Sequence, residues 1–265
     1  MPRFETTSPP FDVGTLATAL SGRLVGRRIA HFDTLGSTMD EARRLAEEGE
    51  PEGLVVVVEE QTAGRGRFNR PWTSPRSENV SLSLLLRPAT AQLHSVNMAA
   101  TLAVCQVVED FGVRGPTIKW PNDVRVGGLK ISGILIESAV DAGRVAYAVV
   151  GIGVNVNLDP SKHPEIATIA TSLLKETGRR QNRTRVLSRL LEHLDDLYAR
   201  VRGGEPLKDE WAARLETLGK TVHLRWGDTL VEGYAEGVDD IGNLLLRLPD
   251  GSTFAASAGE VTLQV

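Results

Sequence analysis

The distribution of apolar residues along the 265-residue chain predicts alternating strands and helices. Four consecutive valines, Val55 to Val58, lie inside 54–59, and such an unbroken β-branched run is typical of a strand buried on both faces. The glycine pair at 127–128 is expected to form a hairpin turn, and residues 151–157 are expected to leave the sheet. Further strands are predicted at 28–33, 80–86, 119–126, 129–139 and 145–150.

Helices are predicted where apolar positions recur every three to four residues. One begins near Ser37 and ends at Gly49, with Asp40 and Glu41 placed to suit its positive N-terminal end. The others are expected at 16–24, 93–111 and 185–201. One face of the last helix carries a row of leucines, which are Leu187, Leu190, Leu191, Leu194 and Leu197.

From about Leu218 the pattern changes to short alternating segments, separated by turns rich in glycine, aspartate and asparagine. Short strands at such regular spacing are typical of a small β-barrel. We therefore predict an α+β domain of residues 1–217, followed by a β-barrel domain of residues 218–265. Trp211 and Trp226 are expected to pack where the two domains meet.

The composition favours an ordinary globular protein, because 41% of the residues are hydrophobic. The formal net charge of −4 argues against a nucleic-acid-binding protein, which usually carries a basic surplus. We find neither a signal peptide nor an apolar run of the roughly 20 residues that a membrane span needs. A cytoplasmic location without a membrane partner is therefore expected.

Cysteine and histidine usage indicates neither disulfide bonds nor a metal site. Cys105 is the single cysteine, and its apolar surroundings in the sequence predict an inert, packed thiol rather than a nucleophile. No metal-ligand spacing relates the histidines, which are His31, His94, His163, His193 and His223.

The arginine loop, residues 61–76, concentrates positive charge in an otherwise acidic chain. From Gln61 to Trp72 it reads Gln-Thr-Ala-Gly-Arg-Gly-Arg-Phe-Asn-Arg-Pro-Trp. Its clustered arginines are Arg65, Arg67 and Arg70. Guanidinium groups bind phosphate and carboxylate as forks, glycines let the backbone approach a ligand, and Trp72 offers a face for stacking. A ligand-binding loop is therefore favoured over a solvated basic loop.

This loop is not a standard dinucleotide or phosphate motif. A Rossmann fingerprint beginning at Gly64 would need a third glycine where Asn69 stands, and Pro71 and Pro75 forbid the helix that should follow. A Walker A sequence is also absent. Side chains must therefore hold any phosphate that binds here.

A second polar cluster lies at 119–123, where the sequence reads Lys-Trp-Pro-Asn-Asp, with Lys130 shortly downstream. Lys119 and Lys130 can supply positive charge to developing phosphate anions, and Asp123 can hold Mg²⁺. The alternative is that Asn122 and Asp123 only form a turn. Lys130 borders an apolar strand, where a lysine usually needs an anionic partner.

In this order, the motifs resemble those of the biotin protein ligases. Each motif alone is modest, but the ordered set is highly specific, and the resemblance covers almost the whole chain. It implies a biotin/lipoate ligase-like catalytic domain, in which helices flank a mixed sheet, and a C-terminal SH3-like β-barrel. The motifs are Ser37-Thr38 with Gln61, Gly64 to Trp72, 119–123, Lys130-x-x-Gly133-Ile134-Leu135, and Gly151-Ile152-Gly153-Val154-Asn155.

The resemblance also implies a role for each motif residue. Lys130 would bridge the biotin carboxylate and the α-phosphate of ATP, so Lys130 and Arg67 are the expected catalytic residues. Biotin would be bound by Ser37, Thr38, Gln61, Arg65, Gly66, Arg67 and Lys130. The nucleotide would be bound by Arg67, Arg70, Trp72, Asn122, Asp123 and Lys130.

The implied reaction forms biotinyl-AMP from biotin and ATP, then transfers biotin to a lysine of the biotin carboxyl carrier domain of a biotin-dependent carboxylase. The attacking carboxylate and the α-phosphate are both anions. Arg67 and Lys130 would screen their repulsion, each contributing roughly 3 kcal/mol when well placed. Mg²⁺, with Asp123 as its candidate ligand, would neutralise the leaving pyrophosphate. The arginine loop would then exclude water from the reactive anhydride.

Two features depart from the family pattern. Met39 stands where the family often has asparagine after Ser-Thr, so it can contact a ligand only through its backbone or its thioether. About 36 residues precede Ser37, too few for the helix-turn-helix domain of the DNA-binding members. A short-form ligase without direct DNA binding is therefore expected.

Three other functions stay open at this point. A lipoate- or octanoate-protein ligase shares the fold and the acyl-adenylate chemistry, although the arginine loop and the C-terminal barrel favour biotin. A non-catalytic biotin sensor would have the same pocket, but the combination of Arg67, Asp123 and Lys130 favours an enzyme that brings two anions together. RNA binding through the arginine loop is disfavoured by the acidic balance.

Overall fold

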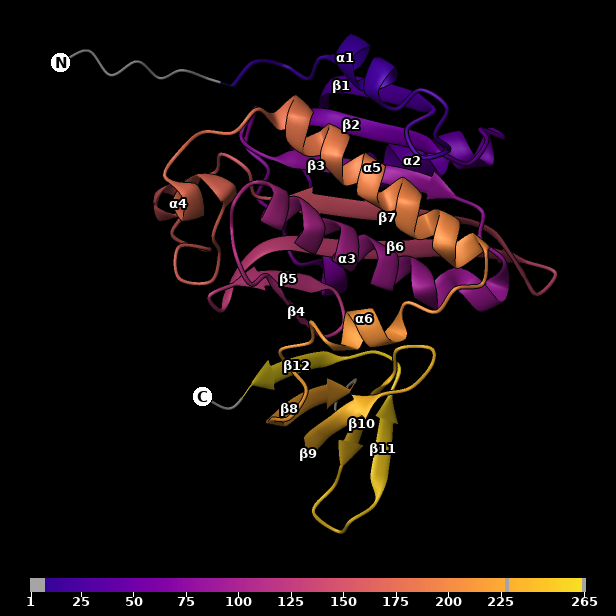
Figure 1. Cartoon of the computed structure of the whole chain (residues 1–265), viewed down its shortest axis with the longest axis vertical. Helices are drawn as coiled ribbons and strands as arrows, with labels where there is room; N and C mark the ends of the chain where they lie inside the picture. The colour runs from indigo at the N-terminus through magenta and orange to yellow at the C-terminus, as the bar shows by residue number, and fades with distance from the viewer. Residues whose placement is uncertain (1–7, 227–228, 264–265) are drawn as a thin grey trace.

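The computed structural model describes residues 8–226 and 229–263. Within them, a seven-stranded sheet with the order β1-β2-β3-β7-β6-β5-β4 forms the centre of the larger part (Figure 1). β1 and β2 run parallel, and the other neighbouring pairs are antiparallel. The strands are β1 (Arg28–Leu35), β2 (Leu54–Gln61), β3 (Val80–Leu86), β4 (Thr117–Lys119), β5 (Asp123–Val126), β6 (Leu129–Asp141) and β7 (Arg144–Val154).

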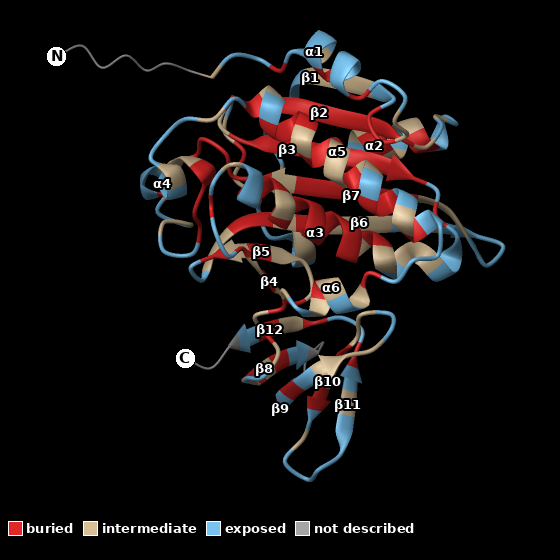
Figure 2. Ribbon diagram, viewed as in Figure 1, coloured by how far each residue is buried: buried red, intermediate tan, exposed pale blue. Residues whose placement is uncertain are grey.

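Helices cover both faces of this sheet, because its central strands are apolar on both sides. Val55 and Val57 of β2 belong to the main core, which also holds α3 and α5, whereas Val56 packs with Met39 and Ala42 of α2. The predicted two-sided burial of the valine run is thus confirmed (Figure 2). The helices are α1 (Val13–Ala19), α2 (Thr38–Glu47), α3 (Leu93–Asp110), α4 (Leu173–Thr177), α5 (Arg183–Arg202) and α6 (Lys208–Ala212).

Two predicted helix features are confirmed. The leucine row of α5 is buried against the core, and Cys105 is fully buried in α3. Burial raises the pKa of the Cys105 thiol to about 12, so it stays a protonated packing group at neutral pH.

Three predicted boundaries are wrong. The first helix begins at Val13, because Asp12 caps it with a 2.9 Å hydrogen bond from the Thr15 amide. The strand predicted at 119–126 is two strands, since Pro121 lacks an amide donor and the chain reverses there. Residues 151–154 stay in the sheet, because their backbone pairs with β3 on one side and β6 on the other.

A smaller five-stranded antiparallel sheet, with the order β11-β10-β9-β8-β12, follows the helical part (Figure 1). The predicted α+β fold, with a mixed sheet, flanking helices and a small C-terminal β-domain, is confirmed. The strands are β8 (Thr221–Trp226), β9 (Thr229–Val238), β10 (Leu244–Arg247), β11 (Thr253–Ala256) and β12 (Glu260–Leu263).

The two sheets are joined by buried contacts. The indole of Trp120 donates to the Gly242 carbonyl at 2.9 Å, across the junction. Trp211 is buried there as predicted, with its indole bonded to Thr101 Oγ1 at 3.0 Å, while the side chain of Trp226 lies outside the described ones. These contacts fix the small sheet beside the β4–β5 end of the large one.

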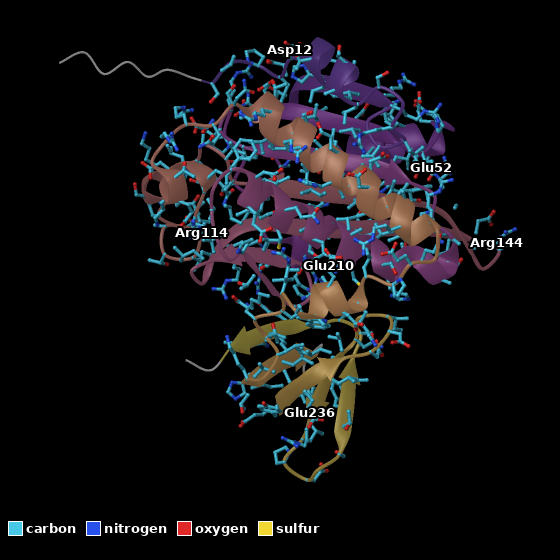
Figure 3. All side chains as sticks on the ribbon, in the orientation of Figure 1. Asp12, Glu52, Arg114, Arg144, Glu210 and Glu236 are labelled. Atoms are coloured by element: carbon cyan, nitrogen blue, oxygen red, sulfur yellow. The ribbon has the colours of Figure 1, made fainter. Side chains whose placement is uncertain are left out.

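Ion pairs lie on the surface of both the larger, helix-covered part and the small sheet. Glu210, on α6 near the junction, lies 3.0 Å from Arg200, and Glu236 of the small sheet lies 3.0 Å from Arg247 (Figure 3). Among the described residues, no helix has both the length and the apolarity to span a lipid bilayer.

Candidate active site

One cavity of about 440 Å³ lies between the arginine loop, the start of α2 and strands β5 to β7, with the edge of the small sheet closing one side. Every residue predicted to bind a ligand lines it. These residues are Ser37, Thr38, Gln61, Arg65, Gly66, Arg67, Arg70, Trp72, Asn122, Asp123 and Lys130.

The floor of the cavity is hollow because glycines occupy facing positions of β6 and β7. Gly133 pairs with Gly153, and Leu135 pairs with Gly151, in the antiparallel register. A Cβ atom on Gly151 would lie 2.5 Å from the Met39 sulfur, and one on Gly153 would lie 2.3 Å from the nearest atom of the Trp72 indole. The missing side chains therefore create room for Met39 and Trp72 and leave space above the sheet.

One end of the cavity is polar and already hydrogen-bonded. Ser37 caps α2 by accepting from the Met39 amide at 3.3 Å. The amide and hydroxyl of Thr38 donate to Gln61 Oε1 at 2.9 and 3.1 Å, and Ser83 donates to the Thr38 hydroxyl at 2.8 Å. Because Thr38 occupies Oε1, the Nε2 amino group is what Gln61 can offer a ligand.

The arginine loop is a tight turn that bonds to itself. The Gly66 amide donates to the Arg70 carbonyl, and the Trp72 amide donates to the Gly64 carbonyl, both at 2.8 Å. At its tip, Phe68 has a φ of 57°, in the left-handed region that costs a non-glycine residue roughly 1–2 kcal/mol, and its side chain is largely exposed. The loop thus holds a closed shape over the cavity.

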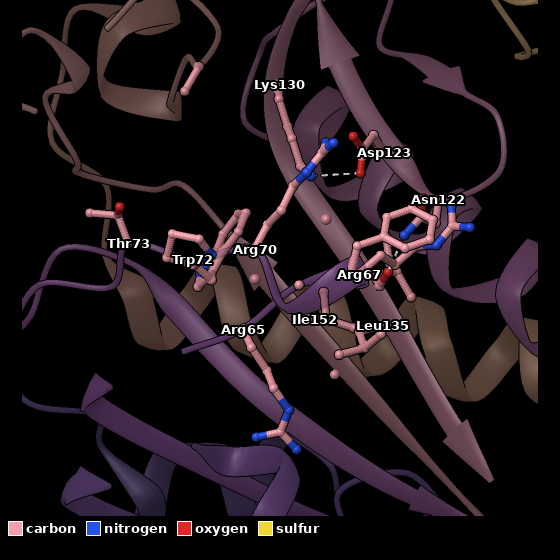
Figure 4. A pocket seen from close by; sticks show the side chains of 18 of the residues that line it. Arg65, Arg67, Arg70, Trp72, Thr73, Asn122, Asp123, Lys130, Leu135 and Ile152 are labelled. Carbon is pink, nitrogen blue, oxygen red and sulfur yellow. Dashed lines mark hydrogen bonds and ion pairs between the residues drawn. The ribbon is translucent and has the colours of Figure 1, made fainter. Parts of the chain in front are cut away.

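Arg65 fastens the start of the loop to α2. Its guanidinium forms two hydrogen bonds to the Asp40 carboxylate, at 2.7 and 2.8 Å, and this bonding holds the pKa of Asp40 below its ordinary value. In Figure 4 the Arg65 side chain points away from Lys130 and Asp123. The geometry makes Arg65 an anchor of the loop, and its contact with biotin stays a prediction.

We expect the substitution Asp40→Asn to loosen the loop. The lowered pKa means that the ion pair stabilises the loop at neutral pH and is lost as the pH falls through that lowered value. Because Asp40 is more than half exposed, the effect on ligand affinity should be only about 2- to 5-fold, matching an exposed ion pair. Hydrogen exchange of residues 64–72 should accelerate; unchanged exchange would show that Asp40 does not hold the loop.

Arg70 fastens the other end of the loop to the small sheet. Its two terminal nitrogens each lie 2.6 Å from a carboxylate oxygen of Glu260, and this pairing lowers the pKa of Glu260. Sequence reasoning missed Glu260, because it lies 190 residues away in a segment without a motif. It missed Ile166 and Ile169 of the cavity wall for the same reason.

Arg67 and Lys119 are the desolvated cations of the cavity. Burial lowers the pKa of both. Arg67 donates to the neutral Asn122 Oδ1 at 3.3 Å and stacks on Phe68, with its guanidinium carbon 5.0 Å from the ring centre. A partly buried guanidinium whose bonded partner is a neutral amide favours the binding of an anion.

Lys130 forms an ion pair with Asp123, with 2.7 Å between Nζ and Oδ1 (Figure 4). The anionic partner expected for this lysine is thereby found. Its ammonium group also lies 5.7 Å from the centre of the Trp72 ring. The Ile134 amide donates to the Asn122 carbonyl at 3.1 Å, so Asn122 and Asp123 join β5 to β6 rather than forming only a turn.

Asp123, in the cavity lining, is the candidate ligand for Mg²⁺. Within the described part of the chain, no three His, Cys, Asp or Glu side chains gather as metal ligands. The carboxylate of Asp123 is engaged by Lys130. Mg²⁺ commonly binds through substrate phosphates and one or two carboxylates. The role of Asp123 as a magnesium ligand stays a prediction.

Comparison with known proteins points to one family. Residues 32–155 match the Biotin/lipoate A/B protein ligase family, and residues 217–263 match the Biotin protein ligase C terminal domain. The chain is 35% identical over 263 residues to the biotin--[acetyl-CoA-carboxylase] ligase of Mycobacterium tuberculosis, covering 96% of each. It is 35% identical over 237 residues to the bifunctional ligase/repressor BirA of Bacillus subtilis, covering 88% of this chain and 73% of that one.

A solved structure shows the same similarity in three dimensions. The biotin protein ligase from Aquifex aeolicus in complex with biotin and ATP superposes with a TM-score of 0.76 at 28% identity, over 90% of this chain and 99% of that one.

Proposed function

The chain belongs to the biotin protein ligase family, and from this premise we propose that it forms biotinyl-AMP from biotin and ATP and transfers the biotinyl group to a lysine of a biotin carboxyl carrier domain. One observation carries the proposal. One cavity contains both the polar group around Gln61 and the cations around Lys130. The neutral ureido ring of biotin can therefore bind at one end, and the biotin carboxylate and the α-phosphate of ATP can meet at the other.

The biotin end of the cavity combines hydrogen bonding with an apolar wall. Ser37, Thr38 and Gln61 would meet the polar ureido ring. Thr38 and Gln61 are bonded to each other, and Ser37 accepts from the Met39 amide, so all three are held before ligand arrives. Met39 and Leu135 line the wall beside the glycine floor. A bicyclic ring with a short apolar chain suits this mixture of preset polar groups and apolar surface.

The chemical step needs the cations at the other end. A biotin carboxylate oxygen attacks the α-phosphorus of ATP, a new O–P bond forms, and the bond to the pyrophosphate oxygen breaks. Arg67 and Lys130 reduce the repulsion between the two anions and stabilise the charge of the transition state. Mg²⁺ brought with ATP would neutralise the departing pyrophosphate. Asp123 keeps Lys130 in place before the substrates bind.

The second step breaks the mixed anhydride. The neutral amine of the carrier lysine attacks the acyl carbon, an amide bond forms, and AMP leaves with its electron pair while the amine loses a proton. The arginine loop, fastened at Arg65 and Arg70, would keep water from the anhydride until the carrier arrives.

Pyrophosphate release from ATP tests this function. We expect release that depends on biotin and that lipoate or octanoate does not support. Release with lipoate or octanoate but not with biotin would identify a ligase of the related class. Biotin binding without any release would identify a non-catalytic sensor. Mass spectrometry of an added carrier domain then tests for a biotinyl-lysine.

A further inference from the structure

A chain of buried amide hydrogen bonds links the arginine loop to the strand that carries Lys130. Asn79, which is 2% exposed, donates through Nδ2 to the Thr73 carbonyl and to Asn155 Oδ1, both at 3.2 Å. Its Oδ1 accepts from the Val156 amide at 3.3 Å. Thr73 directly follows Trp72, so Asn79 holds the end of the loop next to the cavity floor.

The chain continues from Asn155 to Lys130. Asn155, which is 3% exposed, donates through Nδ2 to the Thr171 carbonyl at 3.0 Å. The Thr171 amide donates to the Lys130 carbonyl at 2.9 Å, and the Lys130 amide donates to the Ile169 carbonyl at 2.8 Å. The backbone of Lys130 is therefore held from both sides by segment 169–171.

This chain of hydrogen bonds through Asn79 and Asn155, here called the relay, is also attached to the core. Arg183 donates to the Asn79 carbonyl at 3.3 Å and forms a buried ion pair with Glu59 at 2.5 Å. Both residues of this ion pair are almost fully buried. The backbone of Asn79 is thus fixed, so its side chain holds Thr73 and Asn155 at a set distance from each other instead of moving with them.

We infer that Asn79 is a positioning residue, which acts through Asn155 of the cavity wall to set the spacing between the arginine loop and Lys130 across the cavity. This inference rests on the proposed function, because the two elements are those that would hold biotin and ATP. Each relay position needs a group that both donates and accepts, since Thr73 and Thr171 present carbonyl acceptors and Val156 presents a donor. A carboxylate has the same shape but cannot donate.

The substitution Asn79→Asp tests the loop side of the relay. A carboxylate would face two acceptors, the Thr73 carbonyl and Asn155 Oδ1, and would release the loop. We expect kcat for biotin-dependent pyrophosphate release to fall by about 10- to 100-fold, as for a misplaced reacting group, with the KM for biotin changed less than about 3-fold. Amides of residues 70–73 should exchange faster with solvent.

Asn157→Asp is the matched control. Asn157 is 1% exposed, and its side chain bonds to Ser8 and Gln181 rather than to the loop. This variant should lose fold stability comparably, as read by thermal unfolding, but keep its kcat and its loop exchange. Equal losses of kcat in the two variants would reduce Asn79 to a structural residue and overturn the inference.

Asn155→Asp separates the two ends of the relay. It keeps the acceptor that Asn79 uses but removes the donor to Thr171. Exchange should rise at 169–171 and stay unchanged at 70–73, and the opposite pattern would contradict the relay. The exchange measurements need no substrate, so they decide the relay even if the unchanged protein releases no pyrophosphate, which would refute the proposed function instead.

Discussion

The substitution Lys130→Ala is expected to lower kcat for biotin-dependent pyrophosphate release by about 10²- to 10³-fold, or roughly 3–4 kcal/mol of transition-state stabilisation. Two effects act in the same direction. The variant loses the cation that would lie between the attacking carboxylate and the α-phosphate. It also removes the ammonium group that lies 2.7 Å from the Asp123 carboxylate, so that Asp123 becomes an extra negative charge beside two anions.

The measurement is a steady-state pyrophosphate assay at saturating ATP, which compares Lys130→Ala and three further variants with the unchanged protein. Lys175→Ala removes an exposed lysine of α4 and should leave kcat unchanged. Asp123→Asn keeps the lysine but removes its partner, and should cost less than Lys130→Ala. The double variant Lys130→Ala with Asp123→Asn should recover part of the loss, because no unpaired carboxylate remains. If the kcat of Lys130→Ala alone stayed within about 3-fold of that of the unchanged protein, Lys130 would not act at the reacting centre.

Most of the candidate site could be predicted, because its residues are of types that are typical of phosphate and carboxylate binding. Arginines, glycines and a tryptophan at 64–72, and a lysine at 130, are unusual in an acidic chain and seldom occur together without a ligand. All of them except Gly64 line one cavity. Their order along the chain identified the family, and the family in turn supplied roles that composition alone cannot give.

The partners of Arg65 and Arg70 could not be predicted, because they come from segments whose local sequence is ordinary. Glu260 follows a turn of the small sheet, and Asp40 looked like a carboxylate that suits the start of a helix. Both bind arginines of the loop only because tertiary packing brings them there. An arginine predicted to bind a ligand can equally bind a carboxylate of its own chain, and the sequence does not distinguish the two.

The glycine-rich end of β7 shows a different limit. Glycine lowers strand propensity, so 151–157 reads as a loop. In the fold, hydrogen bonds to β3 and β6 keep Gly151 and Gly153 in the sheet. What the pattern could not reveal is that the missing side chains serve the cavity, because only the folded structure places Met39 and Trp72 over them.

That arrangement makes Gly153→Ala the second substitution with a large expected effect. The new Cβ would lie 2.3 to 2.6 Å from three atoms of the Trp72 indole. The backbone at Gly153 cannot retreat, since it pairs with Ser81 on one side and Gly133 on the other. The indole must therefore move, and the end of the arginine loop must move with it.

We expect the affinity for biotin to fall at least about 10-fold, or about 1.4 kcal/mol, in isothermal titration calorimetry. Overpacking should also lower the free energy of unfolding by about 1–3 kcal/mol. Gly237→Ala is the matched control, because Gly237 lies in β9 with nothing within 4 Å of the position of its Cβ, and it should change neither quantity.

The double variant Gly153→Ala with Trp72→Ala separates crowding from loss of contact. Without the indole the new methyl group has room, so the stability lost to overpacking should return. Affinity for biotin should stay low, because the wall that Trp72 forms is gone. If Gly153→Ala instead bound biotin as tightly as the unchanged protein, Trp72 would have to be free to leave the floor. The closed loop would then be one conformation among several rather than the form that binds.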